Sequence, residues 1–320
     1  MTKPRKIYTE IDSLKGFAIF LVVLGHAIIY FPVNLHDIPW CNVLFTMLSG
    51  VHMPLFFAIS GFCFSYRGNY RDFLTKKIKR LLVPYFLFNL LDLAPRALLP
   101  QLVNRPQGML ESVRDILLQG GAYWFLYTLF IIFAFYPFLY RWQAKSRGRR
   151  MIVTALCLVL SLVRIPTELF TLNLVSGYLF FFNLGVQVKL SDIPVFDFKL
   201  QKGCKLLPMA AAILWVGLLF SPWAGPLEVF VSLLSVILCC FLARWKVFCR
   251  IFKEFGKFSL QLYLLNGFLL VISRTIICRF TADPFAIIGF NMLVDFILAH
   301  LAIKHICSRF KIFRFIMSIG

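Results

Sequence analysis

The sequence predicts an all-α integral membrane protein of about ten transmembrane helices, with both termini in the cytoplasm. Three observations support this fold class: the composition, the number of long apolar runs, and the uneven distribution of basic residues between those runs. Of the 320 residues, 60% are hydrophobic and only 15% are charged, and the mean hydropathy is +0.81. Soluble domains are close to half apolar and carry about 25% charged residues, so this composition indicates a membrane protein.

Ten apolar runs are long enough to be considered as membrane spans. A transmembrane helix needs about 20 apolar residues, with a range of roughly 17 to 25. We place the spans at residues 11–31, 43–65, 78–95, 121–140, 151–166, 170–188, 205–221, 226–242, 258–276 and 285–303. No connection is long enough for a second domain, so we expect one membrane-embedded domain over residues 1–320.

The basic residues lie almost entirely on one side of these ten spans. Cytoplasmic loops carry an excess of Lys and Arg, and 27 of the 34 Lys and Arg residues fall in the connections of one side. Six arginines fall on the other side, namely Arg96, Arg105, Arg114, Arg164, Arg274 and Arg279, and Lys15 lies within a span. This asymmetry predicts cytoplasmic termini.

The net charge of +20 would suggest a nucleic-acid partner in a soluble protein. Here the charges lie between apolar runs, so we expect the lipid bilayer as the partner and no nucleic acid.

The nine cysteines include no CxxC pair, and Cys63, Cys157, Cys239 and Cys240 lie inside apolar runs. We therefore expect buried thiols, no metal site and no permanently bound cofactor.

The longest connection contains the stretch "MLESVRDILL", residues 109–118. Its apolar residues recur at helical spacing, and its charged residues fall on the opposite face. The pattern predicts an amphipathic helix that lies flat on the outer membrane surface.

The first span, in "DSLKGFAIFLVVLGHA", carries groups that are costly to place in a bilayer. Lys15 and His26 are eleven residues apart, which puts them on one stripe of a helix about 16 Å apart, and Asp12 joins that stripe. Intramembrane ionisable groups usually face a protein interior or a water-filled cavity. We expect this stripe to line a polar cavity.

Each of these residues has a structural alternative. Lys15 could extend to the cytoplasmic interface with Asp12 as its ion-pair partner, and His26 could simply hydrogen-bond a neighbouring helix. A neutral imidazole is also a suitable general base near neutral pH. We therefore take His26 as the candidate base, supported by Asp12.

The second span contains "HMPLFFAISGFCF", in which His52 and Ser60 are eight residues apart. Ser60 and Gly61 would let another backbone approach closely, so packing alone could explain them. His52 and Ser60 are also candidates for a substrate pocket.

Two further stretches can each be explained either by membrane topology or by a binding site. "KKIKRLLVPYF" places Lys77 and Arg80 before the third span, where cytoplasmic charge bias explains them and a phosphate-binding patch would need them. "GAYWFLYTLF" places Tyr123 and Trp124 at the outer end of the fourth span, either in the interfacial aromatic belt or as a platform on which a sugar stacks.

Together these stretches resemble the integral membrane acyltransferase-3 family of bacterial multi-span O-acyltransferases, particularly its fucose- and glucose-acetylase-like branch. The family has an Asp followed by Arg-x10-His in its first span, and this chain matches it with Asp12, Lys15 and His26, so lysine replaces arginine. "HMPLFFAISGF", "KRLLVPY" and "YWFLYTLF" are similar to the family motifs that follow in this order. "FSLQLYLLNGF" is similar to a late motif in which many members have a histidine where this chain has Asn266.

The resemblance implies a multi-pass protein of the bacterial cytoplasmic (inner) membrane. It implies transfer of an acyl group, usually acetyl from acetyl-CoA, to a hydroxyl of a carbohydrate in a surface polysaccharide or glycolipid precursor. His26 would then accept the proton of the sugar hydroxyl, and Lys15, Lys77 and Arg80 would bind the anionic donor, with Asn266 in the substrate pocket. A two-step variant would first acylate His26 or Ser60.

A transporter or exporter of a carbohydrate or acyl compound is the alternative from another class. Many spans and buried ionisable groups suit a transporter too, but its usual marks are internal repeats and interrupted helices. The sequence has no paired Gly or Pro breaks in its two halves, which favours the enzyme.

Overall fold

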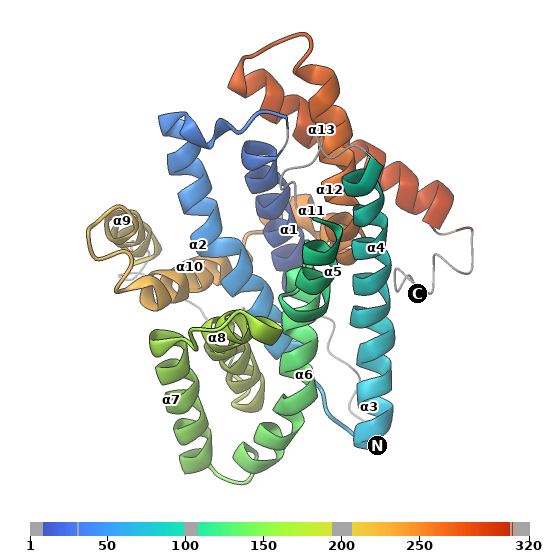
Figure 1. Cartoon of the computed structure of the whole chain (residues 1–320). Helices are drawn as coiled ribbons and strands as arrows, with labels where there is room; N and C mark the ends of the chain where they lie inside the picture. The colour runs from blue at the N-terminus through green and yellow to red at the C-terminus, as the bar shows by residue number, and fades with distance from the viewer. Residues whose placement is uncertain (1–8, 31, 99–107, 194–206, 308, 310–320) are drawn as a thin grey trace.

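The computed structural model describes residues 9–30, 32–98, 108–193, 207–307 and 309, and every regular element in them is helical (Figure 1). The α-helices are α1 (Thr9–Ile29), α2 (Pro39–Phe62), α3 (Tyr70–Lys77), α4 (Val83–Leu98), α5 (Met109–Leu118), α6 (Trp124–Gln143), α7 (Arg147–Val163), α8 (Leu172–Leu190), α9 (Leu207–Leu219), α10 (Glu228–Leu242), α11 (Lys246–Lys257), α12 (Ser259–Ile277) and α13 (Pro284–Ala302). Short 3-10 helices are η1 (Leu35–Asp37) and η4 (Leu169–Thr171), and π-helical turns are η2 (Ile78–Leu82) and η6 (Ile303–Cys307).

The all-α prediction is confirmed for these residues, and each of the ten predicted ranges overlaps one helix. Six helices are long and apolar enough to cross a membrane, or seven if α10 and α11, bent by 107° to each other, form one span. The helices α4, α7, α9 and α10 have only 13 to 17 residues. The count of ten spans therefore stays a prediction, and both chain ends lie outside the described residues.

Helix α1 lies within the bundle and packs against α2, α11, α12 and α13 (Figure 1). Twelve of its 21 residues are buried, including the small residues Gly16, Ala18 and Gly25. The other nine residues are partly exposed. Helix α1 therefore presents most of its surface to protein.

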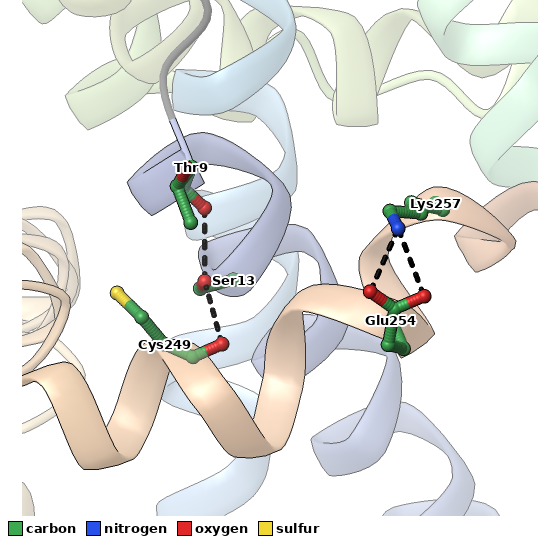
Figure 2. Close-up of polar contacts among 5 residues, drawn as sticks. All are labelled: Thr9, Ser13, Cys249, Glu254 and Lys257. Carbon is green, nitrogen blue, oxygen red and sulfur yellow. Dashed lines mark hydrogen bonds and ion pairs between the residues drawn. The ribbon is translucent and has the colours of Figure 1, made fainter.

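Helix α11 is an element that the sequence reasoning missed, because its four basic residues were assigned, together with Arg244, to a cytoplasmic loop. It crosses α1 at two glycines: a Cβ on Gly16 would collide with the carbonyl of Phe252, and one on Gly256 with the carbonyl of Asp12. Ser13 Oγ donates to the carbonyls of Thr9 at 2.9 Å and of Cys249 at 3.4 Å (Figure 2). The apolar face of α11 is thus buried against α1, while its outer face carries the Lys257–Glu254 ion pair at 2.7 Å (Figure 2).

The crossing of α2 and α8 also depends on glycines, which confirms the expectation that Gly61 permits a close backbone approach. Gly61 faces the carbonyl of Phe182, and Gly185 faces the carbonyl of Ala58.

Pro54 lies inside α2 and has no N–H to donate to the carbonyl of Gly50. Ser235 Oγ of α10 donates to that carbonyl at 3.1 Å. A backbone group that would be costly to leave unpaired at membrane depth is thereby satisfied, and α10 is tied to α2.

The predicted amphipathic helix at residues 109–118 is confirmed as α5. Ile116 is buried, and its carbonyl accepts from Tyr85 Oη of α4 at 2.5 Å, whereas Leu110 is 82% exposed. The contacts with α4 show which side of α5 faces the protein. Its location on the outer membrane surface stays a prediction.

Arg274 corrects the charge assignment, because we counted it with the outer connections and it is fully buried in α12. Its guanidinium donates to the carbonyls of Ala27, Ile28 and Val33. The last carbonyls of a helix have no partner within the helix, so Arg274 caps the end of α1. The planar fork of a guanidinium can reach several carbonyls at once.

We predict that Arg274→Ala lowers the thermal unfolding midpoint in detergent, with a loss of stability of roughly 3 kcal/mol, because buried carbonyls lose their donors. Arg279→Ala is the matched control, because Arg279 lies five residues further on and is exposed. Thermal unfolding followed by circular dichroism measures both variants. Equal midpoints for the two would contradict the capping role.

Candidate functional site: the contact of His26 with Asn266

His26 and Asn266 come from helices that are 240 residues apart in the sequence, and the structure brings them into contact. Asn266 Nδ2 lies 2.6 Å from His26 Nδ1. Asn266 is 1% exposed, whereas His26 is partly accessible. Helices α1 and α12 run side by side here, with Arg274 fixing the same pair of helices two turns further along. The residue at position 266 therefore contacts the candidate base directly.

This contact controls which ring nitrogen of His26 can accept a proton. With Nδ2 of Asn266 facing it, Nδ1 is the acceptor, and the ring proton lies on Nε2. Rotation of the amide by 180° would place Oδ1 against Nδ1–H and leave the lone pair of Nε2 free. Asn266 Oδ1 has no hydrogen-bond partner among the described residues, so this rotation breaks no bond of that oxygen.

His52 lies close enough to His26 for the two imidazoles to interact electrostatically. Its Nδ1 is 2.6 Å from the carbonyl of Leu48, one turn earlier in α2. Nδ1 therefore carries a proton, and Nε2 of His52 is left as the acceptor. Ser60 lies two turns further along α2 and is partly exposed.

The tyrosine ring of Tyr30 packs beside His26, with ring centroids 4.8 Å apart. Tyr123 is buried, its hydroxyl donates to the carbonyl of Leu264 at 3.0 Å, and its ring meets Tyr263 at 5.8 Å. Tyr123 thus holds the start of α6 against α12, close to Asn266. Its role in the substrate pocket stays a prediction.

Trp124 is half exposed and is the first residue of a stack of aromatic rings. Its ring lies 6.1 Å from Tyr178 at an angle of 19°, and Tyr178 stacks on Phe57 at 4.6 Å and 7°. The rings of Trp124 and Tyr178 pack against a buried cluster that includes Val22, Val23 and Met53, which are neighbours of His26 and His52. The stack therefore packs on the same cluster as the segments of α1 and α2 that carry the two histidines.

The sequence reasoning did not identify the ion pair beside this stack. Arg164 Nη2 lies 2.7 Å from Glu228 Oε2, and both side chains are about half exposed. Both residues interact electrostatically with Tyr178. Arg164 had been counted only as a basic residue of the outer side, and no pattern in the sequence linked it to Glu228, 64 positions away.

Asp12 and Lys15 form an ion pair on α1, with Lys15 Nζ 3.1 Å from Asp12 Oδ1 and both side chains 30% exposed. This is the pairing that the structural alternative for Lys15 predicts. The helix is continuous from these residues to His26, so the stripe along α1 is confirmed. Asp12 does not touch His26, because about four helical turns separate them.

Lys77 and Arg80 differ in their surroundings. Lys77 Nζ lies over the ring of Phe133, 3.6 Å from the centroid, and 5.4 Å from that of Phe73. Burial against these rings lowers the pKa of Lys77 to about 8. Arg80 lies in the π-helical turn η2 and is exposed.

The polar cavity expected along the stripe stays a prediction, because the main cavity lined by described residues is of another kind. A cavity of about 480 Å³ lies between α1, α2, α8 and α10, and its walls are almost entirely apolar. Ile11 and Leu14 line it, but Lys15 and His26 do not. Helices α11 and α12 pack against α1, and the side chains of Asp12 and Lys15 stay 30% exposed.

Asp295 of α13 is a second buried ionisable residue that the sequence reasoning did not single out. It is fully buried, and neither carboxylate oxygen has a hydrogen-bond partner among the described residues. Its position within an apolar run was the available signal, because acids at membrane depth are rare and usually functional. Asn291, one turn earlier, accepts from Ser273 Oγ at 3.2 Å.

Comparisons with known proteins show the family of the chain. Residues 8–302 match the family model Acyl_transf_3, described as "Acyltransferase domain". Two relatives are both named "Nodulation protein NolL". The protein of Mesorhizobium japonicum is 29% identical over 126 residues, which cover 38% of this chain and 33% of the relative. The protein of Sinorhizobium fredii is 30% identical over 141 residues, which cover 41% of this chain and 38% of the relative.

The chain thus matches between a third and two fifths of the length of each of these relatives. No solved structure shows a significant match. The family model, by contrast, covers nearly the whole chain and contains all ten candidate site residues. The protein therefore belongs to the acyltransferase-3 family and is a multi-pass membrane acyltransferase.

Proposed function

We propose that the enzyme transfers acetyl from acetyl-CoA to a hydroxyl of a carbohydrate in a surface polysaccharide or a glycolipid precursor, with His26 as general base. The observation that carries this proposal is the contact of His26 with Asn266. A general base needs a third group that fixes its ring and tautomer, and Asn266 is placed to supply it.

The proposed reaction balances as a direct transfer. With Asn266 Oδ1 accepting from Nδ1–H, His26 Nε2 takes the proton of the sugar hydroxyl as its oxygen attacks the thioester carbonyl. The C–S bond then breaks, the sugar becomes an acetyl ester, and the departing thiolate of CoA receives the proton from His26. Proton transfer by a positioned base contributes about 10²- to 10⁴-fold to a rate.

The donor would be bound on the side where the basic residues gather. Phosphates of CoA require cations, and Lys15, Lys77 and Arg80 supply them. Arg80 is exposed and free to bind, whereas Lys15 would leave Asp12 and Lys77 would leave the Phe133 ring. Lysine binds phosphate as a point charge, so its presence at position 15 in place of the family's arginine keeps the charge.

The acceptor would be bound by the aromatic stack of Trp124 and Tyr178, next to the Arg164–Glu228 ion pair. Sugars present apolar C–H faces that stack on aromatic rings and hydroxyls that hydrogen-bond charged groups. Both kinds of group meet at Tyr178, which packs on the cluster that α1 and α2 share. This arrangement supports a carbohydrate over a purely apolar acceptor.

We further propose ten spans in the bacterial cytoplasmic membrane, with both termini in the cytoplasm. The one-sided distribution of the 34 basic residues supports this topology. It would place Lys15 near the cytoplasmic face and His26 about 16 Å further along α1. Donor and acceptor could then approach the same helix from opposite sides.

The direct test of the base is His26→Ala, assayed by release of free CoA from acetyl-CoA with surface glycans as acceptor. We expect kcat/KM to fall by about 10²- to 10⁴-fold with the thermal midpoint unchanged. His300→Ala is the control, because His300 is exposed on α13. Full activity of His26→Ala would refute the proposed mechanism.

Asn266 gives a second prediction, which depends on the direction of its hydrogen bond. Asn266→Asp offers only acceptors to Nδ1–H and should keep activity within about tenfold, whereas Asn266→Leu should lose about 10²-fold in kcat, the lower end of a base's contribution. The comparison of kcat at saturating donor and acceptor separates positioning from binding. Loss in both variants alike would show that Nδ2 must donate, and that Nε2 is not the base.

Lys77 makes donor binding pH-dependent. Its pKa of about 8 lies below the ordinary value for lysine, so the ammonium is charged below pH 8 and neutral above it. We expect KM for acetyl-CoA to rise as pH passes through about 8, with a flat profile in Lys77→Arg, because arginine stays charged. A rise of equal size in Lys77→Arg would remove Lys77 from donor binding.

A further inference from the structure

The apolar cavity between α1, α2, α8 and α10 plays no part in the proposed transfer, and its volume of about 480 Å³ is that of a ligand site. Fifteen of its sixteen lining residues are apolar, and Arg244 is the sole charged one. Apolar cavities of this kind do not hold water favourably, and a sugar or the polar part of CoA would find no hydrogen-bond partners there.

The cavity is open toward the surface that would face lipid. Ile237 of α10 is 42% exposed and Ile193, after α8, is 51% exposed, and both line it. Helices α1, α2 and α8 are long enough to cross a membrane, and α10 qualifies with α11 as a bent pair. The molecules that surround such walls in the bilayer are lipids.

The length of the cavity fits one leaflet. It extends along α10 from Leu233 to Arg244, eleven residues, or about 16 Å at 1.5 Å per residue. The hydrocarbon core of a bilayer is about 30 Å thick, so this distance is close to half of it. An acyl chain of one leaflet matches the space.

Arg244 defines the headgroup end. It follows directly on the last turn of α10, is half buried, and lies 5.9 Å from the ring of Phe241. Among the described residues, no carboxylate forms an ion pair with it. Lys246, two residues further on, adds positive charge, so an anion is favoured at this end of the cavity.

We propose that this cavity binds an anionic phospholipid, with one acyl chain between α1, α2, α8 and α10 and the phosphate on Arg244. The occupied cavity would hold α10 against α2, where Ser235 already bonds to Gly50. This inference concerns a structural lipid, and it does not depend on the identity of the donor or the acceptor.

The test is native mass spectrometry of the full-length protein with an equimolar mixture of phosphatidylglycerol and phosphatidylcholine of identical chains. We expect wild type to retain phosphatidylglycerol about fivefold more than phosphatidylcholine, since one basic residue near a membrane surface contributes about that factor. Arg244→Ala should retain the two equally. The matched control Arg250→Ala, which changes an exposed arginine on α11, should keep the preference.

A second variant tests the chain site separately. Ile237→Trp fills the mouth of the cavity from a half-exposed position and should reduce retention of both lipids without lowering the thermal midpoint. Equal retention of the two lipids by wild type, loss of the preference in Arg250→Ala, or unchanged retention in Ile237→Trp would overturn the proposal. Retention of only detergent or free fatty acid would assign the cavity to another occupant and would overturn it too.

Discussion

The position of His26 depends on the hydrogen bonds that fix the end of α1. The guanidinium of Arg274 donates these bonds. The carbonyls at the end of α1 would be unpaired in an apolar interior, and Arg274 donates to those of Ala27 and Ile28, directly after His26 in the chain. Because Arg274 and Asn266 both belong to α12, one helix caps α1 and contacts its histidine. The register between the two helices therefore sets the geometry of the base.

The other end of α1 is fixed by α11. Gly16 and Gly256 allow the two backbones to touch, and Phe17 packs edge-on against Phe248 and Phe252 at 5.2 Å from each. The contact positions Asp12 and Lys15 at the side where donor binding is proposed. A helix that is packed at both ends keeps Lys15 and His26 at a fixed separation of about 16 Å. The two residues can therefore serve two separate functions on one helix.

Much of the fold could be predicted from the sequence, because hydrophobic runs of helix length are a direct consequence of the bilayer. His26, Lys15 and Asn266 could also be selected, since polar groups in such runs are costly. The contacts of these residues could not be predicted, because the spacing along the chain does not indicate that Asn266 contacts His26. Helix α11 was missed although Phe248, Phe252 and Phe255 recur at helical spacing, because the basic residues between them suggested a loop. Arg274 was counted as a residue of a connection because a count of charges by side cannot distinguish a buried cap from an interfacial residue.

The central claim is that donor and acceptor meet at one helix from opposite sides of the membrane. Wild-type enzyme in oriented vesicles, with radiolabelled acetyl-CoA outside on the side of the basic loops and glycan acceptor sealed inside, tests it most directly. The account predicts that CoA is released outside while labelled acetyl ester appears only on the sealed glycan. Labelled ester formed only when both substrates share one side, or glycan crossing the membrane without CoA release, would contradict it.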